Sequence, residues 1–286
     1  MLCKVLYKKV RRHVQDMHAI RFTKVGSSLV STATMESSIG NVYALPGFVP
    51  TTPGVQLGTP LLAAPGSVAH TKILSEWIQT CNRHHPCVPK EESFLPKRVI
   101  DLGPAGHGPI RLFCTSHDQT PGRYLTLSHI WGPSMRFYTT RENLDSFTKE
   151  ISSIYMPRTF QHAVEITRNL GIRYLWIDAL CIVQDDREDW DYESKRMEHI
   201  FSSAYATLAA TCAVNAGDGF LKQRPHRACV TLTRQERAGD MPYYFCEAID
   251  DFSGDVDQSE LSKRGWVLQE RVLSKCTIHF AEKQTY

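Results

Sequence analysis

Asp178 is the residue for which the sequence suggests chemistry most clearly. It interrupts an otherwise apolar run at 174–183, a pattern typical of a central parallel strand that is buried on both faces. An unpaired buried carboxylate costs roughly several kcal/mol, so we expect Asp178 to be paired, hydrogen-bonded or close to the edge of the sheet. Ligands bind beyond the carboxyl ends of parallel strands, and Asp178 lies in the latter half of its run. It is therefore a candidate catalytic residue, and the alternative is a structural residue that caps the following loop or pairs with an arginine.

Glu270 is the second candidate catalytic residue, in a segment at 262–273 whose pattern predicts a helix. Trp266 and Glu270 are four residues apart and therefore share one helix face, and Val267 flanks the carboxylate. Apolar neighbours would raise the pKa of Glu270, so that it could do acid–base work or stabilise a cationic transition state. The candidate ligand-binding residues of this segment are Arg264, Trp266 and Gln269. The alternative is an ion pair of Glu270 with a neighbouring basic residue, namely Lys263, Arg264 or Arg271.

A third group of candidates ends the strand predicted at 124–130, at what would be the same edge of a parallel sheet. Ser128 and His129 are adjacent, so their side chains point to opposite faces of a strand and cannot serve each other as nucleophile and base. Trp131 and Gly132 could supply an aromatic wall and a close backbone approach for a planar ligand. We therefore take Ser128, Trp131 and Gly132 as candidate ligand-binding residues. The alternative is core packing by Trp131 and a turn at Gly132.

Three weaker patterns favour structural explanations. Cys181 lies inside the apolar run with no basic residue close in sequence, so we expect a buried, inert thiol. The acidic run at 185–191 lacks the glycine and the terminal glutamate of an EF-hand loop, and it suits a helix N-terminus. A zinc site is a remote alternative, because no second cluster completes a familiar zinc spacing, and we predict no metal site. Its ligands would be Cys81, His84, His85 and Cys87.

The elements that must position these residues alternate between strand and helix. The sequence predicts a helix from Pro157, a residue that suits a first helical turn, to Leu170, with Gly171 ending it. A second helix is predicted at 189–202. This order of elements predicts an α/β fold with a parallel sheet. The predicted strands are 124–130, 174–183, 205–211 and 276–281, and a helix near 71–81 and a hairpin of 98–102 with 110–114 come before them.

Length and composition set the outer limits of the fold. The chain has 286 residues, of which 42% are hydrophobic and 22% charged, and it has no apolar stretch long enough to predict a membrane span. Residues 1–70 carry seven Lys and Arg against two acidic residues, a net charge of +5, and the remaining 26 basic and 28 acidic residues give −2. This balance does not favour nucleic acid as a partner. The nine widely spread cysteines favour a reducing, cytoplasmic location.

The proline- and glycine-rich stretch at 44–66 cannot sustain a helix or a central strand. We therefore expect residues 1–70 to form a basic, Pro-rich, disordered leader in front of a single domain. The stretch at 212–260 is loop-rich and allows no assignment.

Several of these segments together resemble the fungal heterokaryon-incompatibility (HET) domain. The segment 124–132 (Tyr-Leu-Thr-Leu-Ser-His-Ile-Trp-Gly) is similar to the opening block of that domain, and 170–186, preceded by Pro157-Arg-Thr-Phe, is similar to its middle block. The segment 264–274 (Arg-Gly-Trp-Val-Leu-Gln-Glu-Arg-Val-Leu-Ser) resembles its last block. The resemblance covers about residues 75–286.

The resemblance implies a HET domain at 119–286, preceded by a helix and hairpin at 71–118. The family is thought to be distantly similar to TIR domains, which have a flavodoxin-like parallel sheet, so we expect a flavodoxin-like or TIR-like domain. It also implies a role in fungal non-self recognition and programmed cell death. We expect the domain to act as a signalling module through protein partners or self-association.

The alternative function is that of a TIR-like NAD⁺ glycohydrolase, since some TIR-like domains cleave NAD⁺ with a pocket glutamate. Glu270 or Asp178 would then stabilise the ribosyl cation or bind the ribose hydroxyls, and NAD⁺ would be the substrate and no cofactor would be needed. This step is an analogy of folds and not a transfer of motifs. The sequence departs from the family pattern in two ways. Ile130 stands where Cys, Val or Arg is frequent, and the sequence ends at Tyr286, within the family pattern, so we expect the domain to be truncated.

Overall fold

The computed structural model divides the chain into two compact units, which we describe separately. Residues 1–62 and 225–250 make up unit 1, and residues 63–224 and 251–286 make up unit 2. Four strands between residues 21 and 57 are described by their backbone alone. The residues described in full are 62–84, 93–104, 108–115, 120–225, 227–231 and 244–286, with the backbone of 232 and 243.

Unit 1 contains one sheet, whose strands are joined in the order β1-β2-β3-β11-β10, each antiparallel to the next, with β4 parallel to β3. The strands of the expected leader pair with strands from the stretch that the sequence left unassigned, and such long-range pairing leaves no local signal. The strands are β1 (Arg21–Val25), β2 (Ser28–Thr34), β3 (Ser37–Ala44), β4 (Gln56–Leu57), β10 (Cys229–Leu232) and β11 (Tyr243–Glu247).

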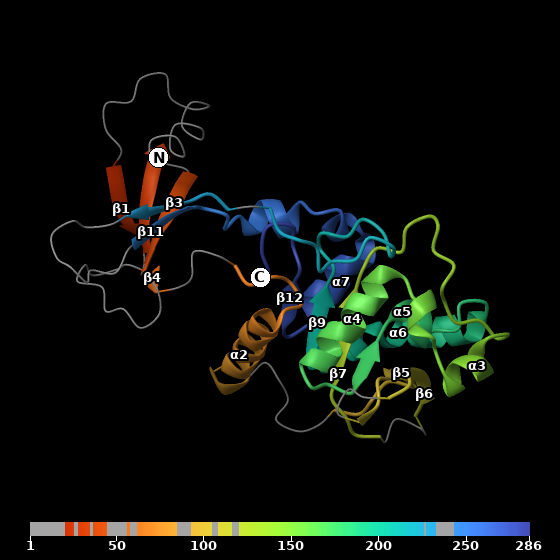
Figure 1. The fold of residues 1–286 in the computed structure, drawn as a ribbon. Helices are drawn as coiled ribbons and strands as arrows, with labels where there is room; N and C mark the ends of the chain where they lie inside the picture. The colour runs from red at the N-terminus through yellow and green to blue at the C-terminus, as the bar shows by residue number, and fades with distance from the viewer. Residues whose placement is uncertain are drawn as a thin grey trace. The chain divides into compact units, whose positions relative to one another are not determined.

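Unit 2 is built on a mostly parallel sheet with the strand order β12-β9-β7-β8-β5-β6 (Figure 1). The first four strands in this order run parallel, and the β5–β6 hairpin joins β8 antiparallel. The α/β class with a parallel sheet is therefore confirmed. The strands are β5 (Arg98–Asp101), β6 (Arg111–Cys114), β7 (Tyr124–Ser128), β8 (Tyr174–Trp176), β9 (Ala206–Ala209) and β12 (Thr277–His279).

The order of the parallel strands reverses direction beside β7. From β7 the chain moves first to β8 on one side and then, through α6, back to β9 on the other side. Open α/β sheets bind ligands at the carboxyl edge where the strand order reverses in this way. Three of the candidate residues lie at this edge. Ser128 is the last residue of β7, and Trp131 and Gly132 follow in the loop after it.

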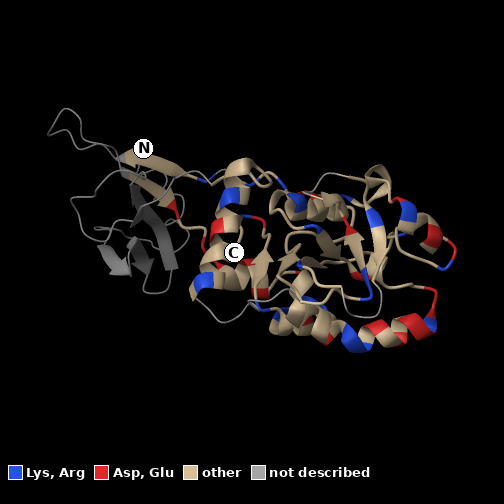
Figure 2. Cartoon of the chain, turned by 90° about the horizontal axis from the view of Figure 1, so that it is seen from below, with Lys and Arg blue, Asp and Glu red and all other residues tan. Residues whose placement is uncertain are grey.

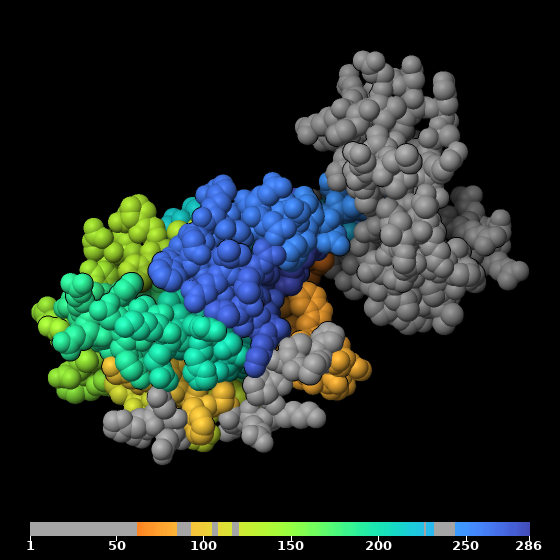
Figure 3. Space-filling view, turned by 180° about the vertical axis from the view of Figure 1, so that it is seen from behind, coloured from red at the N-terminus to blue at the C-terminus, as the bar shows by residue number. Residues whose placement is uncertain are grey.

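Helices cover both faces of this sheet. In Figure 1, α4 lies in front of the strands, and in Figure 3, seen from behind, α6 and the C-terminal segment with α7 cover the opposite face. The predicted helix beginning at Pro157 is confirmed, with Pro157 as N-cap and Gly171 in the left-handed region (φ +71°) just after its end. The helices are α2 (Val68–His84), α3 (Leu144–Lys149), α4 (Arg158–Asn169), α5 (Asp178–Cys181), α6 (Arg187–Ser203) and α7 (Gly265–Leu273). The described residues also include the short helical turns η2 (Ser153–Tyr155), η3 (Ser253–Asp257) and η4 (Leu261–Lys263).

The sequence predicted one long strand at 174–183. This prediction was wrong, because the apolar run is divided between a strand and a short helix. Strand β8 ends at Trp176, and Asp178 opens the short helix α5, where its carboxylate accepts a hydrogen bond from the Ala179 amide (2.7 Å). Thr139 fixes the turn from outside, since its amide and its hydroxyl donate to the carbonyls of Ala179 and Leu180. Asp178 therefore lies beyond the carboxyl end of β8 and not within the strand.

The core of unit 2 holds large side chains from strands and helices, among them Tyr124, Trp176, Phe160 and Phe201. Trp176 and Phe201 meet edge to face, with ring centroids 5.8 Å apart. Charged residues of both signs are interspersed over the described elements (Figure 2). Within the described residues, no helix has the length and apolar character needed to cross a bilayer.

Candidate functional site

Ser128 and Glu270 form a buried pair at the carboxyl edge of the sheet. Ser128 is the last residue of β7, Glu270 lies on the inner side of α7, and the serine hydroxyl donates to the glutamate Oε2 in a short hydrogen bond. Glu270 is only 6% exposed. Burial raises the pKa of Glu270 to about 7, and the charge of Asp178 adds to this rise. The hydrogen bond from Ser128 and the charge of Arg264 act in the opposite direction. Glu270 therefore carries a proton in part of the molecules at neutral pH.

Asp178 lies close enough to act on Glu270, from the first turn of α5. Its Oδ2 accepts a hydrogen bond from Trp131 Nε1 (2.9 Å), and its Oδ1 accepts the Ala179 amide. The Asp178 side chain is 24% exposed. One of these contacts ties the Asp178 side chain to the backbone at the start of α5. Its other contact holds the Trp131 indole in place.

His129 is a buried neighbour that we did not take as a candidate site residue from the sequence. Its ring meets Phe160 of α4 edge to face, with centroids 5.0 Å apart, and its Nδ1 lies 3.8 Å from Asp178 Oδ1. Burial lowers the pKa of His129; the charge of Asp178 opposes this and that of Arg264 adds to it. Nε2 makes no hydrogen bond within the described residues. As predicted from strand alternation, Ser128 and His129 have different surroundings and do not act on each other.

The residues near Glu270 on α7 fall into two groups. Arg264 lies partly buried at the start of the helix and donates to the main-chain carbonyl of His129, whereas Trp266 is 54% exposed. Gln269 is half-buried. The ion pairs that we considered for Glu270 are made with other partners, since Lys263 pairs with Glu260 and Arg271 with Asp257 (2.7 Å).

A cavity of about 310 Å³ opens between the loop after β7 and the turn after β9. Gly132 sits in the left-handed region (φ +77°), and a Cβ built there would lie 2.6 Å from Cβ of Asn215, so only glycine allows the two loops to meet. Glu270 and Asp178 do not line this cavity. Its lining residues include Trp131, Ser134, Arg136, Pro157, Asn215 and Gly217.

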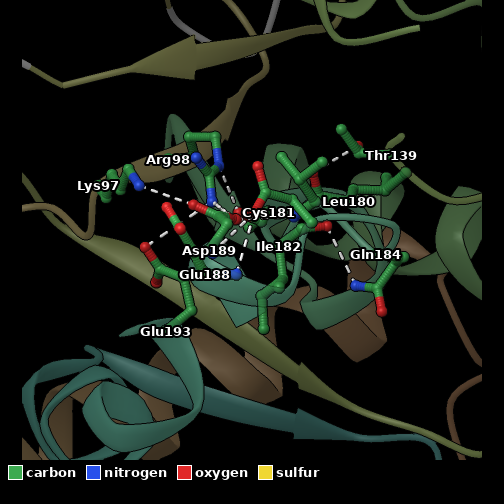
Figure 4. A network of polar contacts seen from close by, with 12 residues as sticks. Lys97, Arg98, Thr139, Leu180, Cys181, Ile182, Gln184, Glu188, Asp189 and Glu193 are labelled. Atoms are coloured by element: carbon green, nitrogen blue, oxygen red, sulfur yellow. Dashed lines mark hydrogen bonds and ion pairs between the residues drawn. The ribbon is translucent and has the colours of Figure 1, made fainter. Parts of the chain in front are cut away.

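A second polar cluster joins β5 to α6 (Figure 4). The carboxylate of Asp189 accepts hydrogen bonds from Lys97 Nζ (2.6 Å), from Arg98 and from the Val183 amide (2.9 Å). Arg98 Nε donates to the Cys181 carbonyl (2.6 Å), and Glu193 Oε1 lies 3.8 Å from the same guanidinium. This cluster fixes the end of α5 at Cys181 and the backbone at Val183, and so supports the position of Asp178. We did not predict it.

The structure shows the surroundings of Cys181 and the role of the acidic run at 185–191. Cys181 is buried, and burial raises the pKa of its thiol, as expected for an inert cysteine. Asp186 caps α6 by accepting the amides of Glu188 and Asp189, so the acidic run does serve a helix N-terminus. Of the four cysteines and histidines considered for zinc, His85 and Cys87 lie outside the described residues.

Comparison with known proteins decides the family. The family model "Heterokaryon incompatibility protein (HET)" matches residues 124–270, from the first residue of β7 to Glu270. The chain belongs to the HET family. "Heterokaryon incompatibility protein 6, OR allele" of Neurospora crassa is 32% identical to the chain, over 39% of the chain and 18% of the relative. The chain therefore spans about a fifth of the length of this relative. No solved structure matches the chain significantly.

The HET match includes every residue that we proposed for the site, because Ser128, Asp178 and Glu270 all lie within it. The resemblance that the sequence suggested is thus confirmed at the level of the family.

Proposed function

We propose that this chain acts in heterokaryon incompatibility, as a fungal non-self recognition protein that triggers programmed cell death. The support is the HET match together with the name of the Neurospora relative. We propose further that residues 119–286 form the HET domain and that a helix and hairpin at 71–118 precede it. We also propose that the protein acts in the cytoplasm and that the HET domain signals through self-association or protein partners.

The outer face of α7 is the feature that best fits an association module. Val267 and Glu270 turn inward, whereas Leu268 and Val272, four residues apart, are 68% and 73% exposed. Trp266 is also 54% exposed, but it lies on the side of the helix that Glu270 shares and is not part of this stripe. Apolar side chains gathered on one exposed helical stripe are typical of interaction surfaces.

A test of this function combines growth with association. The chain is expressed from an inducible promoter in Neurospora crassa, and hyphal death is scored beside the oligomeric state of purified protein by light scattering. Leu268→Glu and Val272→Glu should abolish both while leaving the fold intact by circular dichroism. Ile154→Glu on η2, where Ile154 is 83% exposed, is the matched control and should change neither. Full lethality of both α7 variants would exclude this surface.

The alternative, NAD⁺ hydrolysis, has one specific observation in its favour. Glu270 has a pKa of about 7 and lies near Asp178, a pairing of carboxylates that suits acid–base chemistry. The parallel strand order β8-β7-β9-β12 also matches flavodoxin-like sheets, which TIR domains resemble. Against it, Glu270 is almost fully buried behind Ser128, and the cavity beside Trp131 is lined by neither carboxylate. We therefore rank it second.

The two functions separate in one experiment. Cellular NAD⁺ is measured during induced expression of wild type, Glu270→Gln and Asp178→Asn. Death with unchanged NAD⁺ would reject the hydrolase. A fall in NAD⁺ that disappears in both variants would reject the pure signalling module and would make Ser128, Trp131, Gly132, Arg264, Trp266 and Gln269 the next residues to test as ligand contacts.

A further inference from the structure

Two cysteines face each other across the β10–β11 hairpin of unit 1. Cys229 and Cys246 are direct partners in the antiparallel register of these strands. The neighbouring pair carries a ladder hydrogen bond, since the Glu247 amide donates to the Ala228 carbonyl (2.8 Å). Hydrogen-bonded and non-hydrogen-bonded pairs alternate along antiparallel strands, so Cys229 and Cys246 occupy a non-hydrogen-bonded pair.

This position brings the two thiols within bonding reach. Residues of a non-hydrogen-bonded pair have Cα atoms about 4.5 Å apart, inside the range of about 4.4–6.8 Å that a disulfide spans. The two side chains already interact, since a hydrogen bond links the Cys246 and Cys229 thiols. Both residues are thiols in the structure.

The two thiols differ in access to solvent. Cys246 is fully buried, and burial, with the Cys229 thiol adding to it, raises the pKa of Cys246 to about 12. Cys229 is half-buried on β10, the last strand of the sheet order. A reagent from solution therefore meets Cys229 first, and Cys246 is placed to react with whatever Cys229 has become.

We propose that Cys229 and Cys246 are a redox modification site, which forms an intramolecular disulfide by exchange with a glutathione-type disulfide. The Cys229 thiol loses its proton and attacks one sulfur of the oxidised glutathione, which releases one glutathione thiol and leaves a mixed disulfide. The Cys246 thiol then loses its proton and attacks the Cys229 sulfur, which releases the second glutathione. Two protein thiols become one disulfide, and one glutathione disulfide becomes two thiols.

The bond would fix the register of an edge strand. It joins β10 to β11 covalently and closes the segment 230–245 into a loop, so the hairpin could no longer open as two free strands. This inference concerns unit 1 and does not rest on the function proposed for the HET domain.

The experiment uses the full purified chain, equilibrated with oxidised or reduced glutathione, alkylated with N-ethylmaleimide and digested with trypsin. Cleavage after Arg227, Arg234, Arg237 and Lys263 places Cys229 in peptide 228–234 and Cys246 in peptide 238–263. We expect oxidised glutathione to link these two peptides, with loss of two hydrogen atoms and of two alkylatable thiols per chain. Reduced glutathione should restore both thiols.

Variants identify the roles of the two residues. Cys246→Ser should stop at a stable glutathione adduct on Cys229, and Cys229→Ser should leave Cys246 unmodified. Cys212→Ser is the control, because Cys212 is also half-buried but its Sγ donates to the Phe220 carbonyl in unit 2, and the linked peptide should form as in wild type.

Three outcomes would overturn the proposal. The first is that both thiols remain alkylatable in oxidised glutathione. The second is a glutathione adduct on Cys229 that persists in the wild type with Cys246 intact. The third is linkage of Cys229 to any cysteine other than Cys246, including one of a second copy.

Discussion

Glu270 and Asp189 are both buried carboxylates of unit 2, and they differ in the donors that surround them. Glu270 accepts a hydrogen bond from the neutral hydroxyl of Ser128, and its pKa is raised to about 7. Burial acts to raise the pKa of Asp189 as well. This effect is outweighed by the hydrogen bonds from Lys97 and from the Val183 amide and by the charge of Arg98, which together hold the pKa below its usual range. Burial acts to raise the pKa of both groups; the donors around Asp189 outweigh it, whereas the single hydroxyl beside Glu270 does not.

The same contrast separates a region that stabilises the fold from a region that is available for chemistry. Asp189 remains charged because it is matched by cations, so its cluster holds β5 to α6. Glu270 has no cation in direct hydrogen-bond contact among the described residues, and its proton can therefore leave or return near neutral pH.

Removing the guanidinium of Arg98 should have the largest effect. Arg98→Met leaves Asp189 and Glu193 buried without their main cation, and breaking a buried pair costs about 3–5 kcal/mol. Urea denaturation measures the loss in the free energy of unfolding. Lys97→Met is the control, because the Lys97 side chain is 43% exposed, and it should cost at most about 1 kcal/mol. Equal losses in the two variants would contradict the account.

Glu270→Gln should remove a pH dependence that the wild type carries. The folded pKa is raised above the ordinary 4.5, so the stability that the proton supplies is fully present below about pH 4.5 and is lost as the pH rises to about 7. The difference in unfolding free energy between wild type and Glu270→Gln should therefore shift by about 3 kcal/mol in favour of the variant between about pH 4 and pH 8. Denaturant titrations across this range measure it, and a constant difference would show that Glu270 titrates normally.

Asp189→Asn is the matched variant for that experiment. Because the folded pKa of Asp189 is lowered, its contribution is present above its unfolded pKa of 3.8 and is lost only as the pH falls below that value. The difference between wild type and Asp189→Asn should stay constant across the range in which Glu270 titrates.

Gly132→Ala should cost about 2 kcal/mol, because alanine is strained at φ +77° and its Cβ would meet Asn215. Thermal unfolding measures the loss. Gly265→Ala is the control, since a Cβ there would have no atom within 4 Å and no left-handed backbone is involved, and the midpoint should not fall. A drop of equal size in both variants would count against the loop contact.

The smallest effect is expected from Trp131→Phe, which keeps an aromatic ring but removes the Nε1 donor to Asp178. A hydrogen bond to a partly exposed carboxylate contributes about 1 kcal/mol, so the unfolding free energy should fall by about that amount. Combined with Asp178→Asn in a double-mutant cycle, the loss should be less than additive. Strict additivity would mean that the indole and the carboxylate do not interact.

Local patterns predicted the alternating strands and helices of unit 2, because the period of apolar residues and the caps at Pro157 and Gly171 lie within single elements. They failed at β8, where a continuous apolar run concealed a turn that Thr139 stabilises from a distant loop. They gave no signal for the sheet of unit 1, whose β3 pairs with β11 about two hundred residues later.

For the site, the rule that ligands bind at the carboxyl ends of parallel strands brought Ser128 and Asp178 to one edge from sequence alone. The contact of Glu270 with Ser128 was not predicted, because nothing in the sequence places helix α7 against the end of β7. The cluster around Asp189 was not predictable, because Arg98 and Asp189 are far apart in the chain and each has an ordinary local explanation, a strand residue and a helix cap.

The pairing of β3 with β11 also determines when the sheet of unit 1 can be completed during synthesis. A ribosome that adds roughly 5–20 residues per second needs about 10–40 s to travel from the end of β3 to β11, and it makes most of unit 2 in between. During that interval the edge of β3 that will receive β11 waits without its strand, and open strand edges attract other chains. Nascent-chain chaperones would therefore be needed most at the N-terminal strands, long after these strands have left the exit tunnel.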